Sequence, residues 1–270
     1  MERVVIGGWP GLIGVKEQEA RAWLGDYVQH ISEVGVPAMS PHRNPRNIQR
    51  LLGSLARSVG QPAKLTEIEK DIGGDRGPIA SETLHNYLYA LDRLMLTEAN
   101  EAWRPHMRSR TRLRSSPVRY FVDPSLGPAA LGIGSAELMA DLKGAGFHFE
   151  AMAIRDLRGY SQPLGGVVES WRDANGREVD AVVTLPGGRW AAFEIKLNPV
   201  AADIAAASLL RFASSVDTAR HGEPAALGVI TSTGYAVRRP DGVHVIPIAA
   251  LGPRRPRVPT GRNHGGRHTS

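Results

Sequence analysis

The sequence predicts an α/β fold of the α+β type, with a helical first half and a mixed sheet in the second half. Two observations predict this fold. Between residues 44 and 94 apolar side chains recur at helical spacing, whereas short apolar runs typical of strands dominate between residues 167 and 231. The 270 residues, 42% of them hydrophobic, are enough for one large domain or two of ordinary size.

We divide the chain into four segments. Residues 1–43 form a helical lead-in, whose main helix is expected over 17–32 and should end before the breaker Gly35-Val36-Pro37. The two folded units are residues 44–122 and 123–252. The last segment, 253–270, is a tail rich in Arg, Pro, Gly and His that its composition predicts to be disordered.

The second segment is expected to contain three helices and a hairpin. Asn44 and Pro45 are a cap and first-turn pair for the first helix, and Thr66 is a candidate cap for the second, which stops at Gly73-Gly74. The third helix follows Pro78. Two helices joined by a glycine-containing turn and followed by strands predict a winged helix-turn-helix unit.

In a winged helix the third helix enters a groove of DNA, and its candidate contacts here are His85, Asn86 and Tyr89. Glu82 and Asp92 on the same helix oppose a phosphate backbone. A protein-docking module is therefore the alternative for this unit.

A cationic stretch follows the third helix. On an extended chain, alternate side chains point to one face, where guanidinium groups can contact a phosphate backbone. A solvated loop is the alternative. The residues of this ribbon are Arg104, His106, Arg108, Arg110, Arg112 and Arg114.

The third segment has the order helix, three strands, helix, strand, which predicts an α/β layer with a mixed sheet. We expect a helix over 137–157 that is interrupted or bent near Gly144-Gly146. The other expected elements are a strand over 167–171, a hairpin over 178–196, a helix over 201–216, a strand over 225–231 and a turn at Asp241-Gly242.

In the hairpin sequence EVDAVVTLPGGRWAAFEIK, residues 178–196, the pairing of the two strands decides where the charged side chains lie. A loop at Pro186-Gly187-Gly188 puts Asp180 opposite Glu194, and Lys196 points the same way as Glu194. The odd-numbered positions from 179 to 185 and from 191 to 197 then form an apolar face that belongs in the core.

Two carboxylates across a strand pair repel each other unless a positive charge lies between them. Lys196 can supply part of that charge, and Mg²⁺ or Mn²⁺ bound by Asp180 and Glu194 can supply the rest. A divalent ion with a nearby lysine activates water and stabilises phosphate charge, as hydrolysis of a phosphodiester requires.

This arrangement resembles the restriction-endonuclease-like nucleases of the PD-(D/E)xK type, which share the element order. The resemblance implies that Asp180 is the central acid, that Glu194-Ile195-Lys196 is the E-x-K motif, and that Glu150 is the acid on the preceding helix. It implies catalytic roles for all four charged residues, with the Ile195 carbonyl completing the metal site and Glu150 acting through water or a second ion.

A wider resemblance extends over nearly the whole chain. The stretches GGWPG, WLGDYV, YFVDPSLGPAALG, GFHFEAMAIRDL, REVDAVV and FEIKL are similar, in that order, to the C-terminal half of AAA-type ATPases that carry the domain of unknown function 4143. Ala151 stands where that family has Asn, and Ser125 where it has Gly.

Because Met1 lies almost at GGWP, the ATPase module is expected to be missing. The chain has no G-x-x-x-x-G-K-[ST] pattern, so we expect no ATP site. The resemblance leaves three alternatives: a fragment of a longer ATPase, a partner of a separate ATPase subunit, or an inactive remnant.

The formal net charge of +6 favours an anionic partner such as DNA. The sequence has no cysteine and no apolar run long enough to span a bilayer, so we expect a cytoplasmic protein without a membrane partner. Two hypotheses follow: a metal-dependent nuclease, or a non-catalytic DNA-binding or regulatory module in which Glu194 and Lys196 form a structural ion pair. A protein-interaction role is the third alternative.

Overall fold

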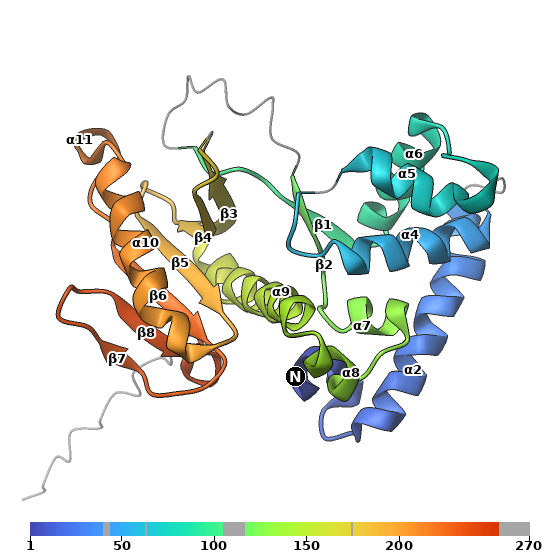
Figure 1. Cartoon of the computed structure of the whole chain (residues 1–270), viewed down its shortest axis with the longest axis horizontal. Coiled ribbons are helices and arrows are strands. Elements are labelled where there is room, and N and C mark those ends of the chain that lie inside the picture. The colour runs from blue at the N-terminus through green and yellow to red at the C-terminus, as the bar shows by residue number, and fades with distance from the viewer. Residues whose placement is uncertain (40–43, 63, 105–116, 174, 254–270) are drawn as a thin grey trace, which may run out of the picture.

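The structure is a computed structural model that describes residues 1–39, 44–62, 64–104, 117–173 and 175–253 (Figure 1). It confirms a mixed α/β chain of the α+β type. The first part is helical and ends in a two-stranded antiparallel sheet. Its elements are α1 (Glu2–Ile6), α2 (Glu17–His30), α3 (Val36–Met39), α4 (Pro45–Arg57), α5 (Leu65–Gly73), α6 (Ser81–Arg93), β1 (Thr97–Asn100), β2 (Val118–Phe121) and α7 (Leu126–Leu131).

The lead-in helix begins at Glu17 as predicted, but the prediction that it ends before Gly35 is wrong. The chain continues as a π-helix over Ile31–Gly35, closed by a bond from the Val36 N–H to the Ile31 carbonyl, and then as α3. Pro37, the second residue of α3, does not end the helical backbone.

Caps define the next helices. The Asn44 side chain accepts a hydrogen bond of 2.9 Å from Arg46 N, and Pro45 is the first residue of α4, as predicted. Thr66 is not the cap of α5, because the helix already begins at Leu65 and Lys64 precedes it without a side-chain cap. The order of three helices and an antiparallel hairpin is the predicted one.

The second part contains a six-stranded mixed sheet of order β3-β4-β5-β6-β8-β7. β5 and β6 are parallel, as are β6 and β8, whereas β3, β4 and β5 are antiparallel neighbours. The elements are α8 (Ser135–Ala140), α9 (Leu142–Ser161), β3 (Val167–Arg172), β4 (Glu178–Thr184), β5 (Trp190–Lys196), α10 (Ala202–Ser215), α11 (Thr218–His221), β6 (Ala226–Thr231), β7 (Val237–Arg238) and β8 (His244–Pro247).

The helix predicted over 137–157 is two helices, so the predicted interruption is present, but it falls before Gly144-Gly146. The break falls at Asp141, whose side chain accepts a hydrogen bond of 3.1 Å from Gly144 N and so caps α9. Both glycines lie within the regular helix, because the cap fixes where it begins.

Helices cover both faces of the sheet (Figure 1). On one face, Ala181 and Ile195 pack with α9; on the other, Val182, Trp190 and Ala192 pack with α10. The apolar face predicted for the hairpin is therefore only one of two buried faces. The prediction is wrong for Val179, which belongs to the core beside α10, because a β-bulge shifts the alternation of β4 between Val179 and Val182.

The helical part reaches into both cores of the sheet. Val4 and Val5 of α1 belong to the core beside α9, and Trp103 belongs to the core beside α10. Trp103 N also donates a hydrogen bond of 2.6 Å to the Ser170 carbonyl at the edge of β3. The two parts of the chain are thus packed together through shared apolar contacts.

Candidate functional site

The register of the β4–β5 hairpin agrees with the prediction. Ala181 pairs with Phe193 and Thr184 with Trp190, and Asp180 and Glu194 are the next residues beyond the last pair. Leu185 N donates a hydrogen bond of 2.8 Å to the Arg189 carbonyl across the loop. The hairpin therefore brings the two carboxylates to neighbouring strands.

A β-bulge shapes the position of Asp180. Val182 pairs with Glu169 and Val179 with Trp171, so β4 has one more residue than β3 between these pairs. Beyond the last β4–β5 pair, the Asp180 carboxylate accepts a hydrogen bond of 2.7 Å from Ile195 N. The side chain thus satisfies a strand N–H that would otherwise need a backbone partner.

One ammonium group lies between the two carboxylates. Lys196 Nζ is 3.0 Å from Asp180 Oδ2 and 2.5 Å from Glu194 Oε2. The Glu194 side chain is only 5% exposed, whereas that of Lys196 is 34% exposed. We call Glu150, Asp180, Glu194 and Lys196 the acidic cluster.

Glu150 joins this cluster from α9. The residue as a whole is half-buried, but its carboxyl is enclosed by protein, and its Oε1 accepts a hydrogen bond of 2.5 Å from Tyr120 Oη of β2. A Cβ at Gly60 would lie 3.3 Å from the same oxygen. The helical part of the chain therefore lies directly against Glu150.

Tyr120 is the residue of this site that the sequence analysis did not single out. It is 2% exposed, and the Arg158 guanidinium carbon lies 5.8 Å from its ring centroid. Its place in the stretch YFVD was a signal only for the wider resemblance. The contact with Glu150 joins residues 30 positions apart, from a strand and a helix, so strand periodicity could not reveal it.

The cluster holds more negative than positive groups. Burial, and then the nearby Asp180 carboxylate, raise the pKa of Glu150 well above its usual range and the pKa of Glu194 to about 8. Burial alone lowers the pKa of Lys196, but Asp180 and Glu194 outweigh it and raise that pKa. Lys196 therefore stays charged, whereas Glu150 and Glu194 tend to keep a proton.

The donor set partly fits a hard divalent cation. Within the described residues, no group of three or more His, Cys, Asp or Glu side chains is arranged to hold a metal ion. Magnesium, however, is commonly held by one or two carboxylates together with water and substrate phosphates. Asp180 and Glu194 supply two such carboxylates, provided that the Lys196 ammonium moves from between them.

The predicted groove contacts lie on one accessible stretch of α6. His85, Asn86 and Tyr89 are exposed, and Tyr89 keeps 59% of its surface accessible. Asp92, one of the acids expected to oppose phosphate, forms an ion pair of 3.2 Å with Arg119. This pairing weakens the electrostatic objection to an anionic partner.

Of the cationic ribbon, the structure describes only Arg104. Its side chain is partly buried, and its Nε has no hydrogen-bond partner in the described part of the chain. The other members, His106, Arg108, Arg110, Arg112 and Arg114, lie outside the described residues.

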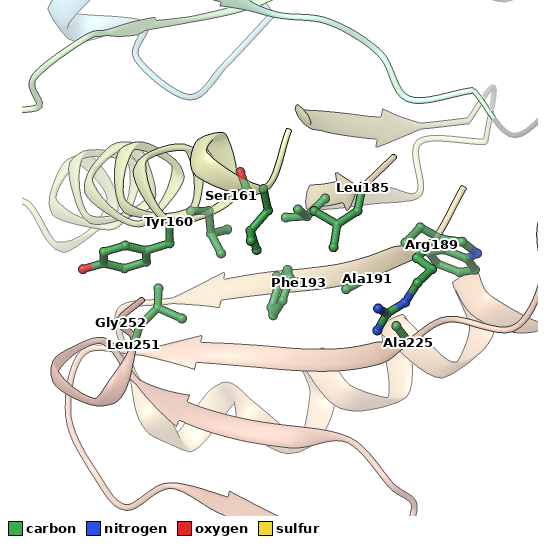
Figure 2. A pocket seen from close by; sticks show the side chains of 13 residues that line it. Tyr160, Ser161, Leu185, Arg189, Ala191, Phe193, Ala225, Leu251 and Gly252 are labelled. Carbon is green, nitrogen blue, oxygen red and sulfur yellow. The ribbon is translucent and has the colours of Figure 1, made fainter. Parts of the chain in front are cut away.

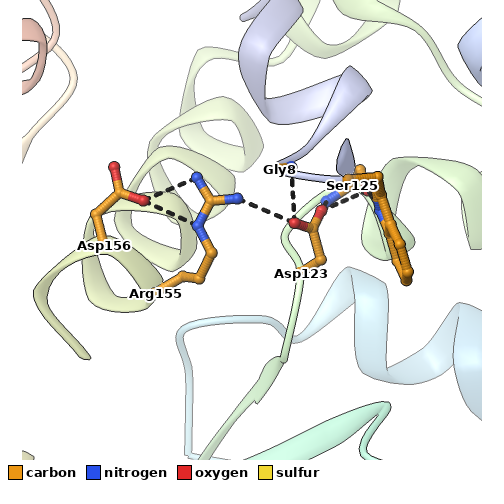
Figure 3. A network of polar contacts seen from close by, with 6 residues as sticks. Gly8, Asp123, Ser125, Arg155 and Asp156 are labelled. Atoms are coloured by element: carbon orange, nitrogen blue, oxygen red, sulfur yellow. Dashed lines mark hydrogen bonds and ion pairs between the residues drawn. The ribbon is translucent and has the colours of Figure 1, made fainter. Parts of the chain in front are cut away.

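A second polar network joins three distant segments (Figure 3). Asp123 accepts hydrogen bonds from Gly8 N at 2.8 Å and from Arg155 Nη1 at 2.9 Å. Ser125 donates to the other oxygen of Asp123 and accepts a bond of 3.0 Å from Trp9 Nε1. The motifs GGWPG and YFVDPSL thus meet on α9 and hold it against the lead-in.

The fold and the acidic cluster define a two-part α+β protein, with a helical unit packed on a mixed sheet. Residues 1–137, which are 137 of the 270 residues, match the family described as domain of unknown function (DUF8612). The chain therefore belongs to that family. Residues 145–251 match a second family, described as domain of unknown function (DUF4143).

The DUF4143 match covers α9 and the sheet with the acidic cluster, in agreement with the resemblance seen in the sequence. No curated protein and no solved structure matches the chain. Among the described residues, no helix is long and apolar enough to cross a membrane.

Proposed function

We propose that the protein is a metal-dependent nuclease-like enzyme that hydrolyses phosphodiester bonds of DNA at the acidic cluster. One observation carries the proposal: Asp180 of β4 and Glu194 of β5 share a single ammonium group in a largely buried place, and Glu150 of α9 lies close enough for Asp180 to raise its pKa. Such an excess of buried negative charge is unfavourable without protons or a cation. A structural ion pair would need only one of these acids.

Asp180 and Glu194 are the residues that would hold Mg²⁺ or Mn²⁺. The ion, when bound, supplies a Lewis acid that activates water and stabilises charge on the phosphate. Lys196, whose side chain is one-third exposed, reaches toward solvent and would orient the attacking water. Glu150 tends to keep a proton without a cation, and it would support the site through water or a second ion once a bound cation favours its ionised form.

In this proposal the helical part both guides and restricts the substrate. Tyr120 and Gly60 lie against Glu150, so they would shield this acid from DNA until these contacts open. The three helices and the hairpin would act as a winged helix-turn-helix unit, with His85, Asn86 and Tyr89 of α6 facing DNA and the ribbon from Arg104 contacting phosphates. A separate AAA-type ATPase subunit is the partner that the resemblance suggests.

The second candidate is a non-catalytic DNA-binding or regulatory module, as a C-terminal fragment or partner of an AAA-type ATPase. The observation that favours it is the place of Lys196, whose ammonium already pairs with both Asp180 and Glu194. In that case the charges stabilise the end of the hairpin and bind no metal.

The decisive experiment measures cleavage of single-stranded, double-stranded and branched DNA with Mg²⁺ or Mn²⁺, together with Mn²⁺ binding without DNA. The variants are Asp180→Asn and Lys196→Gln, and the control is Asp203→Asn, an 82% exposed acid on α10. The nuclease proposal requires cleavage that both site variants lose and the control keeps. DNA binding without cleavage or Mn²⁺ binding in the wild type would support the non-catalytic module instead.

A further inference from the structure

An apolar pocket lies at the other end of the hairpin from the acidic cluster (Figure 2). It lies between the C-terminal end of α9, the loop end of β4 and β5, and the chain after β8, and its volume is about 200 Å³. Most of its wall is aliphatic or aromatic. The main apolar side chains are Leu157, Leu164, Val183, Leu185, Phe193 and Leu251.

The pocket exists because small side chains line part of its wall. Ala191 of β5 stands between Arg189 and Phe193, and Ala225 stands just before β6 (Figure 2). The Ser161 hydroxyl already donates its hydrogen to the Arg158 carbonyl at 3.3 Å, so it can only accept a further hydrogen bond. A larger side chain at Ala191 would fill the space.

The two ends of the pocket differ in charge. Arg189 stands at one end, exposed, and no carboxylate pairs with it among the described residues. The residues outside the described ranges contain no Asp or Glu. At the other end stands Tyr160, whose pKa is raised by burial and then by the negative charge of Asp156. An anion would therefore be attracted to the Arg189 end, whereas at the Tyr160 end the Asp156 carboxylate is already paired with Arg155 at 2.8 Å.

We propose that this pocket binds a small molecule with one apolar ring or short chain and one carboxylate, which pairs with Arg189. A cavity of about 150 Å³ lined by aliphatic and aromatic side chains is enough to bind benzene. The pocket is somewhat larger, so it accommodates a phenyl ring with a short linker. This site does not depend on the proposed nuclease function, because it shares no residue with the acidic cluster.

The test compares two probes of nearly the same shape, 3-phenylpropanoate and the uncharged 3-phenylpropanol. Binding is followed by chemical-shift changes in two-dimensional NMR spectra of the whole chain. We expect dissociation constants on the order of 1 mM, with the carboxylate binding about two- to fivefold more tightly, because an exposed ion pair stabilises a complex only modestly. The shifts should cluster around the pocket.

Three variants locate the site. Arg189→Gln should abolish the preference for the carboxylate and leave binding of the alcohol unchanged. Ala191→Leu should weaken both probes by more than about tenfold, because it fills the pocket. Arg211→Gln, which changes an exposed arginine of α10, should behave as the wild type.

Equal affinity of the wild type for both probes would overturn the pairing with Arg189. Failure of either probe to bind, or binding that survives in Ala191→Leu, would overturn the pocket. Thermal unfolding of each variant checks that it is folded. Arg189→Gln alters only a surface side chain and should stay folded. Its relative affinity for the two probes therefore tests the pairing even if Ala191→Leu unfolds.

Discussion

Helix α9 takes part in two charged clusters that differ in how their carboxylates are satisfied. In the network of Figure 3, each oxygen of Asp123 accepts two hydrogen bonds, from Gly8 N and Arg155 on one side and from the N–H and hydroxyl of Ser125 on the other. In the acidic cluster, one ammonium is shared by Asp180 and Glu194. The first pattern is typical of a structural joint, because every acceptor is paired. The second leaves negative charge in excess, as is typical of functional sites.

The largest expected difference between the two clusters is in activity. Asp180→Asn should lower cleavage by more than about 100-fold and abolish Mn²⁺ binding, because it removes a ligand charge without changing the shape of the side chain. Cleavage per folded molecule, measured with a labelled DNA substrate, should be unaffected by Asp123→Asn. Equal losses in both variants would remove the functional distinction between the clusters.

Mutations in the Asp123 network should lower stability more than mutations in the acidic cluster do. Asp123→Ala should lower the free energy of unfolding by about 2–3 kcal/mol, because it leaves Gly8 N and the Arg155 guanidinium without their carboxylate. Chemical denaturation measures the change. As a control, Asp217→Ala removes a surface acid that lies 3.5 Å from Arg220 and should change stability by no more than about 0.5 kcal/mol. A small effect of Asp123→Ala would show that the network is not a structural joint.

The acidic cluster should also make stability depend on pH. An unfolded glutamate has a pKa of about 4.3, whereas in the folded chain the pKa of Glu194 is about 8 and that of Glu150 is raised. Between these values the folded state binds more protons, so stability should fall as pH rises, by up to about 1.4 kcal/mol per pH unit for each acid. The raised pKa of Lys196 adds no slope there, since its contribution is complete below about 10.4 and is lost only at higher pH.

Denaturation curves from pH 5 to 8 test this slope. Glu194→Gln should flatten it, and Mg²⁺ should stabilise the wild type more at pH 8 than at pH 6 if the ion replaces protons in the cluster. Asp123→Asn should leave the slope unchanged. If the stability of the wild type depended on pH no more than that of Glu194→Gln, the proposed burial of excess negative charge would be wrong.

The smallest expected effect comes from the contact between the two parts of the chain. Tyr120→Phe removes the donor to Glu150 and should lower the free energy of unfolding by about 1 kcal/mol. It should also raise the pKa of Glu150 further, because that hydrogen bond favours the ionised carboxylate. NMR titration of the Glu150 carboxyl carbon measures the shift, and an unchanged titration would show that Tyr120 does not act on this acid.

The sequence by itself determined the local geometry. The Asn44-Pro45 pair defines the start of α4, and the short loop with two-residue periodicity determines the register that puts Asp180 near Glu194 and Lys196. These features depend on neighbours in the chain, where steric and hydrogen-bonding rules are strong. The same rules missed the π-helix at Ile31–Gly35 and placed the interruption near Gly144-Gly146 instead of at Asp141, where a side-chain cap fixes the start of α9.

Only the tertiary structure decided what surrounds the acidic cluster. The contact of Tyr120 with Glu150 and the bond of Gly8 to Asp123 join segments 30 and 115 residues apart. The charge excess at the cluster likewise arises from the packing of α9 against the hairpin, which buries Glu150 beside Asp180. Contacts of this kind depend on how whole elements pack together, and periodicity along the chain does not encode that packing.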